Sequence, residues 1–250
     1  MSKTNTKILK SVALAADFFY LETSKKIKMK YNKLLFQKVF FLAMILNSLF
    51  FSAQDKPFWK DIQEFKMIDQ TNGIPTKPIL FVGSSSFTKW QDVNDYFSGK
   101  TIINRGFGGS RLLDLNYYAD DLLNPYNPRQ IVIYCGENDI ATDNPTAAEV
   151  FERFKTFFGK IRQKYPRVPV AYVSIKYSPS REKFWPDVTE VNALIKSYLK
   201  TQKKAKYIDI TKVMNDANGK LRTDIFLDDM LHMKPEGHKL WSQVMKSHLK

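Results

Sequence analysis

Three serines at positions 84–86 follow an apolar run over residues 79–82 and Gly83, where a strand-like segment ends and a helix-like pattern begins. A serine hydroxyl is a weak nucleophile, and it attacks an acyl carbon only when a base takes its proton and a third group orients that base. Serine is also a preferred residue at the N-terminal cap of a helix. Taken alone, this run is more typical of a helix cap than of a nucleophile.

A base and an orienting acid are present in the C-terminal part of the chain. Of the three histidines, at positions 232, 238 and 248, only His232 has a carboxylate three residues earlier, Asp229. In a turn, this spacing brings both side chains to one side, where a carboxylate can hold the imidazole tautomer that accepts a serine proton. An isolated Asp and His near a helix start are also common on protein surfaces. This pair therefore indicates catalysis only in combination with a nucleophile and oxyanion donors elsewhere in the chain.

Two further segments could stabilise a developing oxyanion. The segment "NRGFGGSR", residues 104–111, has Arg111 where a dinucleotide fingerprint needs its third glycine, so we expect no cofactor there. Its glycines, Gly109 among them, let backbone N–H groups face a substrate, and Asn138 in "GENDI" adds a side-chain amide donor. The alternative is that both segments are ordinary turns, in which Gly, Asn and Asp are frequent.

The pattern around these segments predicts the elements that position them. Short apolar runs alternate with amphipathic stretches, and this order is typical of a parallel sheet covered on both faces. We therefore predict an α/β fold, a three-layer α/β/α sandwich whose parallel sheet has about five strands. Strands are expected near 79–82, 101–104, 131–135, 168–175 and 207–210, and helices from about residue 55 and near 112–124, 147–164, 186–202 and 235–248. Sites in open parallel sheets form beyond the carboxyl ends of the strands, which is where the loops after residues 82, 104, 135 and 175 should converge.

Four blocks in this order resemble the SGNH (GDSL-type) hydrolase family. They are Gly83-Ser84-Ser85, Asn104-x-Gly106 continuing to Gly108-Gly109, Gly136-x-Asn138-Asp139, and Asp229-x-x-His232. The G-x-S-x-G elbow of the general α/β-hydrolases is not satisfied, because Phe87 occupies its last position. The resemblance spans nearly all of residues 79–240 and implies the same flavodoxin-like sandwich.

The resemblance also assigns roles by position. It implies Ser85 as nucleophile, with the backbone N–H groups of Ser85 and Gly109 and the side chain of Asn138 as oxyanion donors. Asp229 is then the acid that orients the base, and His232 is the base. Ser84 departs from the family, which has aspartate at this position, and Ser86 is left to help cap the following helix. We expect neither a cofactor nor a metal.

The N-terminal segment has the order of a secretory signal peptide. A lysine-rich stretch precedes "VFFLAMILNSLFF", residues 39–51, which is followed by Ser52-Ala53-Gln54. This core is shorter than the roughly 20 apolar residues of a membrane-spanning helix. We predict a signal peptide over 29–53 within an extension over 1–53, a hydrolase domain over 54–250, and export to the periplasm or the outside. An uncleaved membrane anchor is the alternative.

The charge does not indicate a nucleic-acid partner. Half of the net charge of +14 lies within residues 1–53, and the remainder is spread over the chain without a nucleic-acid-binding motif. After cleavage we expect no membrane contact either, and the predicted partner is a small-molecule or glycan acyl ester.

Other conspicuous residues receive structural interpretations. The single cysteine, Cys135, ends an apolar run and is expected to be buried. The "SREK" segment over 180–183 is interpreted as a solvated face. Carboxylates Glu137, Asp139, Asp143 and Asp228 are expected to be solvated or structural. The aromatic residues Phe107, Tyr117, Tyr118, Tyr177, Phe184 and Trp185 are expected to pack in the core or in loops, and the alternative is that they form an acyl pocket or a sugar platform.

The predicted function is an exported serine esterase that hydrolyses short acyl esters, with acetyl groups on carbohydrate as the leading expectation. A lipase or lysophospholipase is the second reading. A glycan-binding protein that kept the fold and lost the reaction is the third.

Overall fold

The computed structural model describes residues 25, 28–30, 32–33, 35–41 and 56–250. Its contacts divide the chain into two compact units, Met1–Lys56 and Pro57–Lys250. The predicted apolar core beyond residue 41 and the cleavage site near residue 53 lie outside the described residues. Within the described part, no helix is both long and apolar enough to cross a membrane.

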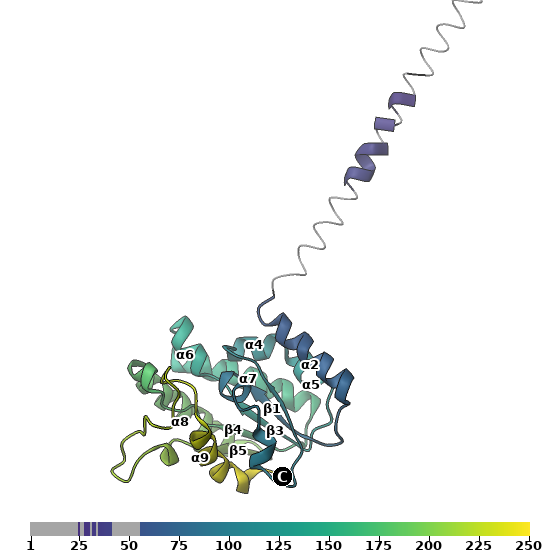
Figure 1. Cartoon of the computed structure of the whole chain (residues 1–250). Coiled ribbons are helices and arrows are strands. Elements are labelled where there is room, and N and C mark those ends of the chain that lie inside the picture. The colour runs from purple at the N-terminus through teal and green to yellow at the C-terminus, as the bar shows by residue number, and fades with distance from the viewer. Residues whose placement is uncertain (1–24, 26–27, 31, 34, 42–55) are drawn as a thin grey trace, which may run out of the picture. The chain divides into compact units, whose positions relative to one another are not determined.

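A single parallel sheet forms the middle of the second unit (Figure 1). Its strands lie side by side in the order β2-β1-β3-β4-β5, and every neighbouring pair is parallel. The strands are β1 (Ile79–Gly83), β2 (Ile102–Gly106), β3 (Gln130–Tyr134), β4 (Val170–Val173) and β5 (Ala205–Ile208). This is the flavodoxin-like strand order, and it confirms the predicted five-stranded parallel sheet.

Helices cover both faces of the sheet, which explains why its strands are apolar throughout. Along β1, Leu80 and Val82 pack into one core while Ile79 and Phe81 pack into the other, as the two-residue period of a strand requires. The first core contains side chains of α2 (Trp59–Asn72), α4 (Leu112–Tyr117), α5 (Ala119–Leu123), α7 (Ala147–Lys164) and α8 (Trp185–Thr201). The second contains side chains of α3 (Ser85–Thr88) and α9 (Pro235–Met245). The three-layer prediction is confirmed.

Several predicted boundaries were wrong. The first helix begins at Trp59 rather than near residue 55, because Phe58 adopts a left-handed conformation at φ 64°. The helix expected over 112–124 is two helices, since Tyr118 leaves helical geometry between them. The polar loop expected after 135 contains α6 (Glu137–Asp143), which starts after Gly136 at φ 126°, a backbone angle that favours glycine.

The strand order fixes where a site can form. From β1 the chain moves to one side to form β2 and then returns to the other side to form β3, so the order reverses between β1 and β3. In open α/β sheets the crevice at such a reversal, beyond the carboxyl ends of the strands, is the usual ligand site. The serine run follows β1 and Asn138 follows β3, so both border this crevice.

A buried histidine in the second core makes stability depend on pH. The ring of His238 stacks on Trp90 with centroids 4.8 Å apart, and its Nε2 has no hydrogen-bond partner among the described residues. Burial lowers the pKa of His238 to about 4, whereas an unfolded histidine has a pKa of about 6.5. The unfolded chain therefore takes up a proton first, and stability falls as the pH drops from about 6.5 towards 4.

We expect a shift from about pH 7 to about pH 5 to cost the native protein about 2 kcal/mol of unfolding free energy through His238. His238→Phe keeps a ring against Trp90 and should lack this component. Urea unfolding of both proteins at the two pH values measures the difference. An equal pH dependence in both proteins would rule out the contribution of His238.

Candidate active site

Ser85 is the most accessible of the three serines. It begins α3 directly after the end of β1, where it is half-buried, whereas Ser84 and Ser86 are 2% and 1% exposed. The turn depends on Gly83, because a Cβ atom at that position would lie 2.0 Å from the carbonyl oxygen of Tyr134. The backbone N–H of Ser84 donates to the same carbonyl at 3.0 Å. The turn is thus held against the end of β3, and Ser85 is the partly accessible residue of the run at this edge of the sheet.

The glycine-containing loop after β2 is hydrogen-bonded to the turn at Gly83. The carbonyl of Gly83 accepts hydrogen bonds from the N–H of Phe107 at 3.0 Å and from the hydroxyl of Ser110 at 3.3 Å. Gly109 lies between them, exposed, at φ 83°, a backbone angle that favours glycine. In the part of the chain that the structure describes, neither the Ser85 N–H nor the Gly109 N–H donates to another residue. Two backbone donors are therefore free beside the crevice.

Asn138 lies next to this loop. Its Nδ2 donates to the carbonyl of Ser110 at 3.0 Å, so the amide is one residue away from Gly109. The side chain sits in the first turn of α6 and is 8% exposed. Each Nδ2 carries two hydrogens, and one of them remains for a ligand.

Asp229 and His232 form a close pair in the loop before α9. The Oδ2 of Asp229 lies 2.6 Å from Nδ1 of His232, and its Oδ1 accepts the N–H groups of Leu231 and His232 at 2.9 Å. Burial would raise the pKa of Asp229, but hydrogen bonds from the backbone and ring of His232 outweigh it and lower the pKa to about 2. An ionised carboxylate on Nδ1 keeps a proton on that nitrogen, which leaves Nε2 as the acceptor.

The loop with Asp229 and His232 is tied to the loop after β4. Both the N–H and the hydroxyl of Ser180 donate to the carbonyl of Met230, at 3.1 and 3.0 Å. Among the described residues, no hydrogen bond joins Ser85 to His232. Catalytic hydrogen bonds are often long or poorly aligned before a substrate binds.

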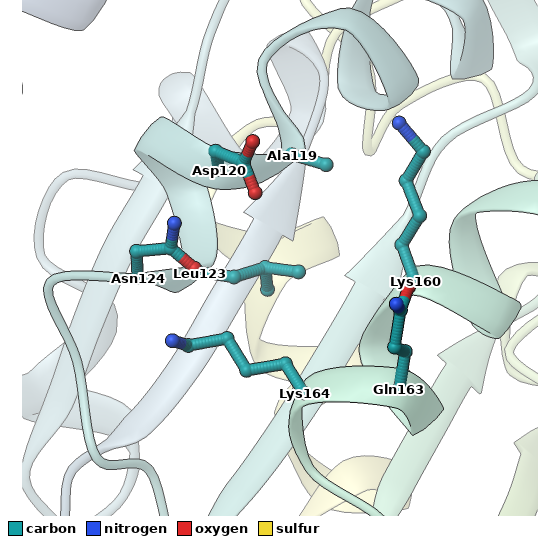
Figure 2. Close-up of a pocket in the computed structure, with 7 residues that line it drawn as sticks. All are labelled: Ala119, Asp120, Leu123, Asn124, Lys160, Gln163 and Lys164. Atoms are coloured by element: carbon teal, nitrogen blue, oxygen red, sulfur yellow. The ribbon is translucent and has the colours of Figure 1, made fainter.

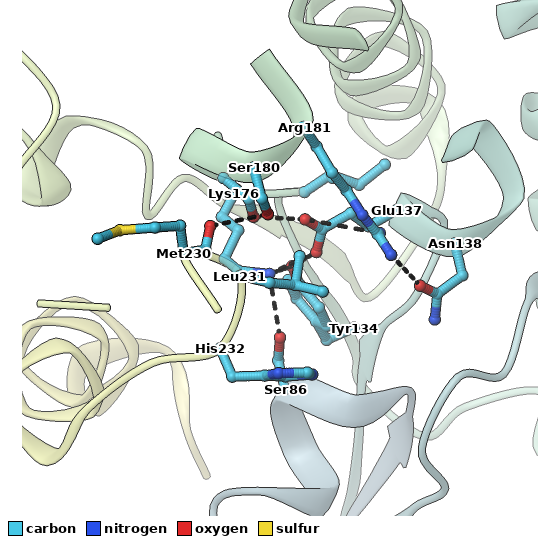
Figure 3. Close-up of polar contacts among 12 residues, drawn as sticks. Ser86, Tyr134, Glu137, Asn138, Lys176, Ser180, Arg181, Met230, Leu231 and His232 are labelled. Carbon is cyan, nitrogen blue, oxygen red and sulfur yellow. Dashed lines mark hydrogen bonds and ion pairs between the residues drawn. The ribbon is translucent and has the colours of Figure 1, made fainter. Parts of the chain in front are cut away.

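A buried ionic cluster lies behind the serine turn (Figure 3). Lys176, 1% exposed, forms an ion pair with Glu137 and donates to Tyr134 at 3.2 Å and to Ser86 at 3.3 Å. Ser86 therefore does not cap the helix as predicted, because its hydroxyl accepts from the lysine inside the core. Ser178 donates to Glu137 at 2.5 Å and completes the cluster.

Arg181 is the residue that the sequence reading missed. The sequence predicts a solvated face for the "SREK" segment, but this is wrong for Arg181: its Nη2 donates to Oδ1 of Asn138 at 2.9 Å, and its side chain is 19% exposed. No pattern in the sequence distinguishes Arg181 from Lys183 beside it. The contact depends on a tertiary approach between α6 and the 3₁₀ turn η2 (Pro179–Phe184).

Other interpretations from sequence are also resolved. Cys135 is buried as predicted. Glu137 and Asp139 are buried and paired, since Asp139 binds Arg153 at 2.9 Å and accepts the N–H of Leu112 at 2.8 Å. Asp228 is exposed, and the side chain of Asp143 lies outside the described residues. Phe107 and Tyr118 pack in the core, whereas Tyr117 is exposed.

Two pockets lie away from these residues. One, of about 430 Å³, is lined by side chains of α5 and α7 and by Asn124 (Figure 2). The other, of about 550 Å³, is lined by Tyr177, Glu182, Trp185, Pro186, Thr189, Asn215, Gly219 and Leu221. Neither pocket is lined by Ser85, Gly109, Asn138, Asp229 or His232, whereas the second contains two of the aromatic residues singled out in the sequence, Tyr177 and Trp185.

The loops beyond the carboxyl ends of the strands thus carry a partly accessible hydroxyl, an oriented imidazole and three N–H donors. Such a set can add a hydroxyl to a carbonyl carbon and hold the resulting oxyanion.

Comparisons with known proteins identify the family and the fold. The model of the GDSL-like lipase/acylhydrolase family matches residues 73–240. A search of curated protein sequences finds no match.

Several solved structures share the fold. One is a Streptococcus pneumoniae protein provisionally named as a platelet activating factor, with 20% identity and a TM-score of 0.68 over 84% of this chain and 99% of that chain. A GDSL-like lipase from Bacteroides thetaiotaomicron has 18% identity and a TM-score of 0.60, over 75% and 97% of the two chains. A family 3 carbohydrate esterase from Clostridium thermocellum has 15% identity and a TM-score of 0.54, over 68% and 94%.

The family match covers about two thirds of the sequence, from the loop before β1 to α9, and includes all four blocks that border the crevice. The chain belongs to the GDSL-like lipase/acylhydrolase family.

Proposed function

We propose that this protein is a serine esterase in which Ser85 is the nucleophile, His232 the base and Asp229 the residue that orients it. The observation that carries the proposal is the set of hydrogen bonds that joins the loops after β1, β2 and β3 at one edge of the sheet. The half-buried Ser85 begins a helix at the strand-order reversal. The Asn138 amide and two N–H groups without a partner among the described residues lie on the loops around it.

The reaction follows from these groups. Ser85 Oγ bonds to the ester carbonyl carbon while His232 Nε2 takes its proton, and the carbonyl oxygen becomes an oxyanion. The N–H groups of Ser85 and Gly109 and the amide of Asn138 donate to that oxygen. His232 then protonates the alcohol as the C–O bond breaks, and a water molecule, deprotonated by the same ring, releases the acid from Ser85.

Short acyl esters, with acetyl groups on carbohydrate first among them, are the proposed substrates. Structures that share this fold include one named an acetyl esterase and two named as carbohydrate esterases of family 3. Export also fits such a substrate, and we propose that residues 29–53 act as a signal peptide, as their basic and apolar order suggests.

A panel of 4-nitrophenyl acetate, butyrate and palmitate, together with acetylated xylan, tests this proposal on the purified full chain. We expect the acetyl ester to give the highest kcat/KM and the polysaccharide to release acetate. A preference for palmitate would favour the lipase alternative. Absence of hydrolysis of every ester, combined with binding to the polysaccharide, would favour a glycan-binding protein.

A further inference from the structure

The orientation of the Asn138 amide is fixed by its two partners, and Figure 3 shows the contact with one of them, Arg181. Its Oδ1 accepts from the guanidinium of Arg181, a group with donors only, and its Nδ2 donates to the carbonyl of Ser110, an acceptor only. A flipped amide would place its NH₂ against the guanidinium and its oxygen against the carbonyl, and both contacts would be repulsive. With both partners in place, the free hydrogen of Nδ2 is left for the oxyanion.

Arg181 is itself held by the buried cluster. Its Nη1 lies 3.8 Å from Oε1 of Glu137 and makes no hydrogen bond among the described residues. Burial would raise the pKa of Glu137, but the positive charges of Lys176 and Arg181 outweigh it, so the pKa lies below its ordinary range. The carboxylate is therefore charged and attracts the guanidinium, which cannot lose its own charge.

The same carboxylate connects Arg181 with the nucleophile turn. Glu137 pairs with Lys176, and Lys176 donates to Ser86, the residue after Ser85. One buried cluster thus contacts the neighbour of the nucleophile on one side and, through Arg181, the oxyanion donor on the other.

We propose that Arg181 is a positioning residue, which holds the Asn138 amide with its N–H towards the oxyanion and strengthens it as a donor. The proposal rests on the esterase function proposed above. Because a hydrogen bond to a charged group is stronger than one between neutral groups, Arg181→Met should lower kcat about 10- to 100-fold, which is about 1.4–2.7 kcal/mol, with little change in KM.

A double-mutant cycle with Asn138 tests this role. Asn138→Ala alone should lower kcat about 100- to 1000-fold. If Arg181 acts through this amide, adding Arg181→Met to Asn138→Ala should change kcat by less than about twofold. Arg181→Lys keeps the charge beside Glu137 without the planar fork, and it should give an intermediate loss in a fully folded protein.

Lys183→Met is the matched control, because it removes a positive charge from the same 3₁₀ turn, and it should leave kcat unchanged. An equal loss from Arg181→Met in both backgrounds would overturn the positioning role, as would an effect on KM alone. An unchanged kcat in Asn138→Ala would instead refute the proposed oxyanion site. The two failures are therefore distinguishable.

Discussion

Ser85→Ala should lower kcat for 4-nitrophenyl acetate about a million-fold, to the level that the oxyanion donors and binding alone sustain. The hydroxyl of Ser85 is the atom that forms the acyl bond, and no other side chain of the crevice replaces it. The substitution removes one oxygen from a half-buried position, so the free energy of unfolding should change little.

The neighbouring serines supply the matched controls. Ser84→Ala alters a residue whose backbone carbonyl, rather than its side chain, accepts the N–H groups of Phe87 and Thr88. Ser86→Ala removes an acceptor of Lys176, which keeps its contacts with Tyr134 and Glu137. Both variants should keep kcat within about 10-fold of the native value, the size of one modest hydrogen bond. A million-fold loss in Ser86→Ala and none in Ser85→Ala would move the nucleophile by one residue.

His232→Ala should cause a loss of similar size, because without a base the hydroxyl of Ser85 stays protonated. Asp229→Asn should cost less, about 10,000-fold, since the ring remains but loses the partner that fixes its tautomer. His248→Ala removes a histidine outside the crevice and should leave kcat unchanged. Steady-state kinetics of the three variants give the comparison, and an active His232→Ala enzyme would contradict the assignment.

The pH profile separates the roles of this pair. The pKa of Asp229 is about 2, so this carboxylate stays ionised at every pH above about 4. Protonation of Asp229 therefore does not account for any loss of kcat/KM between about pH 4 and 7. Asp229→Asn should alter the height of the profile throughout this range.

The fold was predictable because its strands are buried on both faces. Continuous apolar runs such as residues 131–135, separated by amphipathic stretches, leave few arrangements other than a covered parallel sheet. The direct contact between Asp229 and His232 was also predictable, because a spacing of three residues is local. The helix boundaries were harder to predict, since no feature of the sequence pattern marks the non-helical backbone of Phe58 and Tyr118.

The supporting groups of the site were not predictable from sequence. Lys176 follows an apolar strand, and a lysine there is ordinarily exposed, yet it is buried against Glu137, 39 residues away in sequence. The sequence pattern predicts that Arg181 is one of several solvent-exposed charges in residues 180–183. Both residues acquire their partners only when the loops after β3 and β4 meet. The contact of Ser86 with Lys176 likewise exists only in the folded chain, so the sequence alone favours a capping role for Ser86.

The most direct test of the central claim, that Ser85 is the nucleophile of an acylhydrolase, is covalent labelling with diisopropyl fluorophosphate followed by peptide mass spectrometry. Attack by Oγ forms a bond to phosphorus and releases fluoride, and the serine proton passes to the base. We predict one adduct, on Ser85, that forms in step with the loss of esterase activity and does not form in His232→Ala. Loss of activity with the adduct on another residue, or full activity after complete modification of Ser85, would contradict the claim.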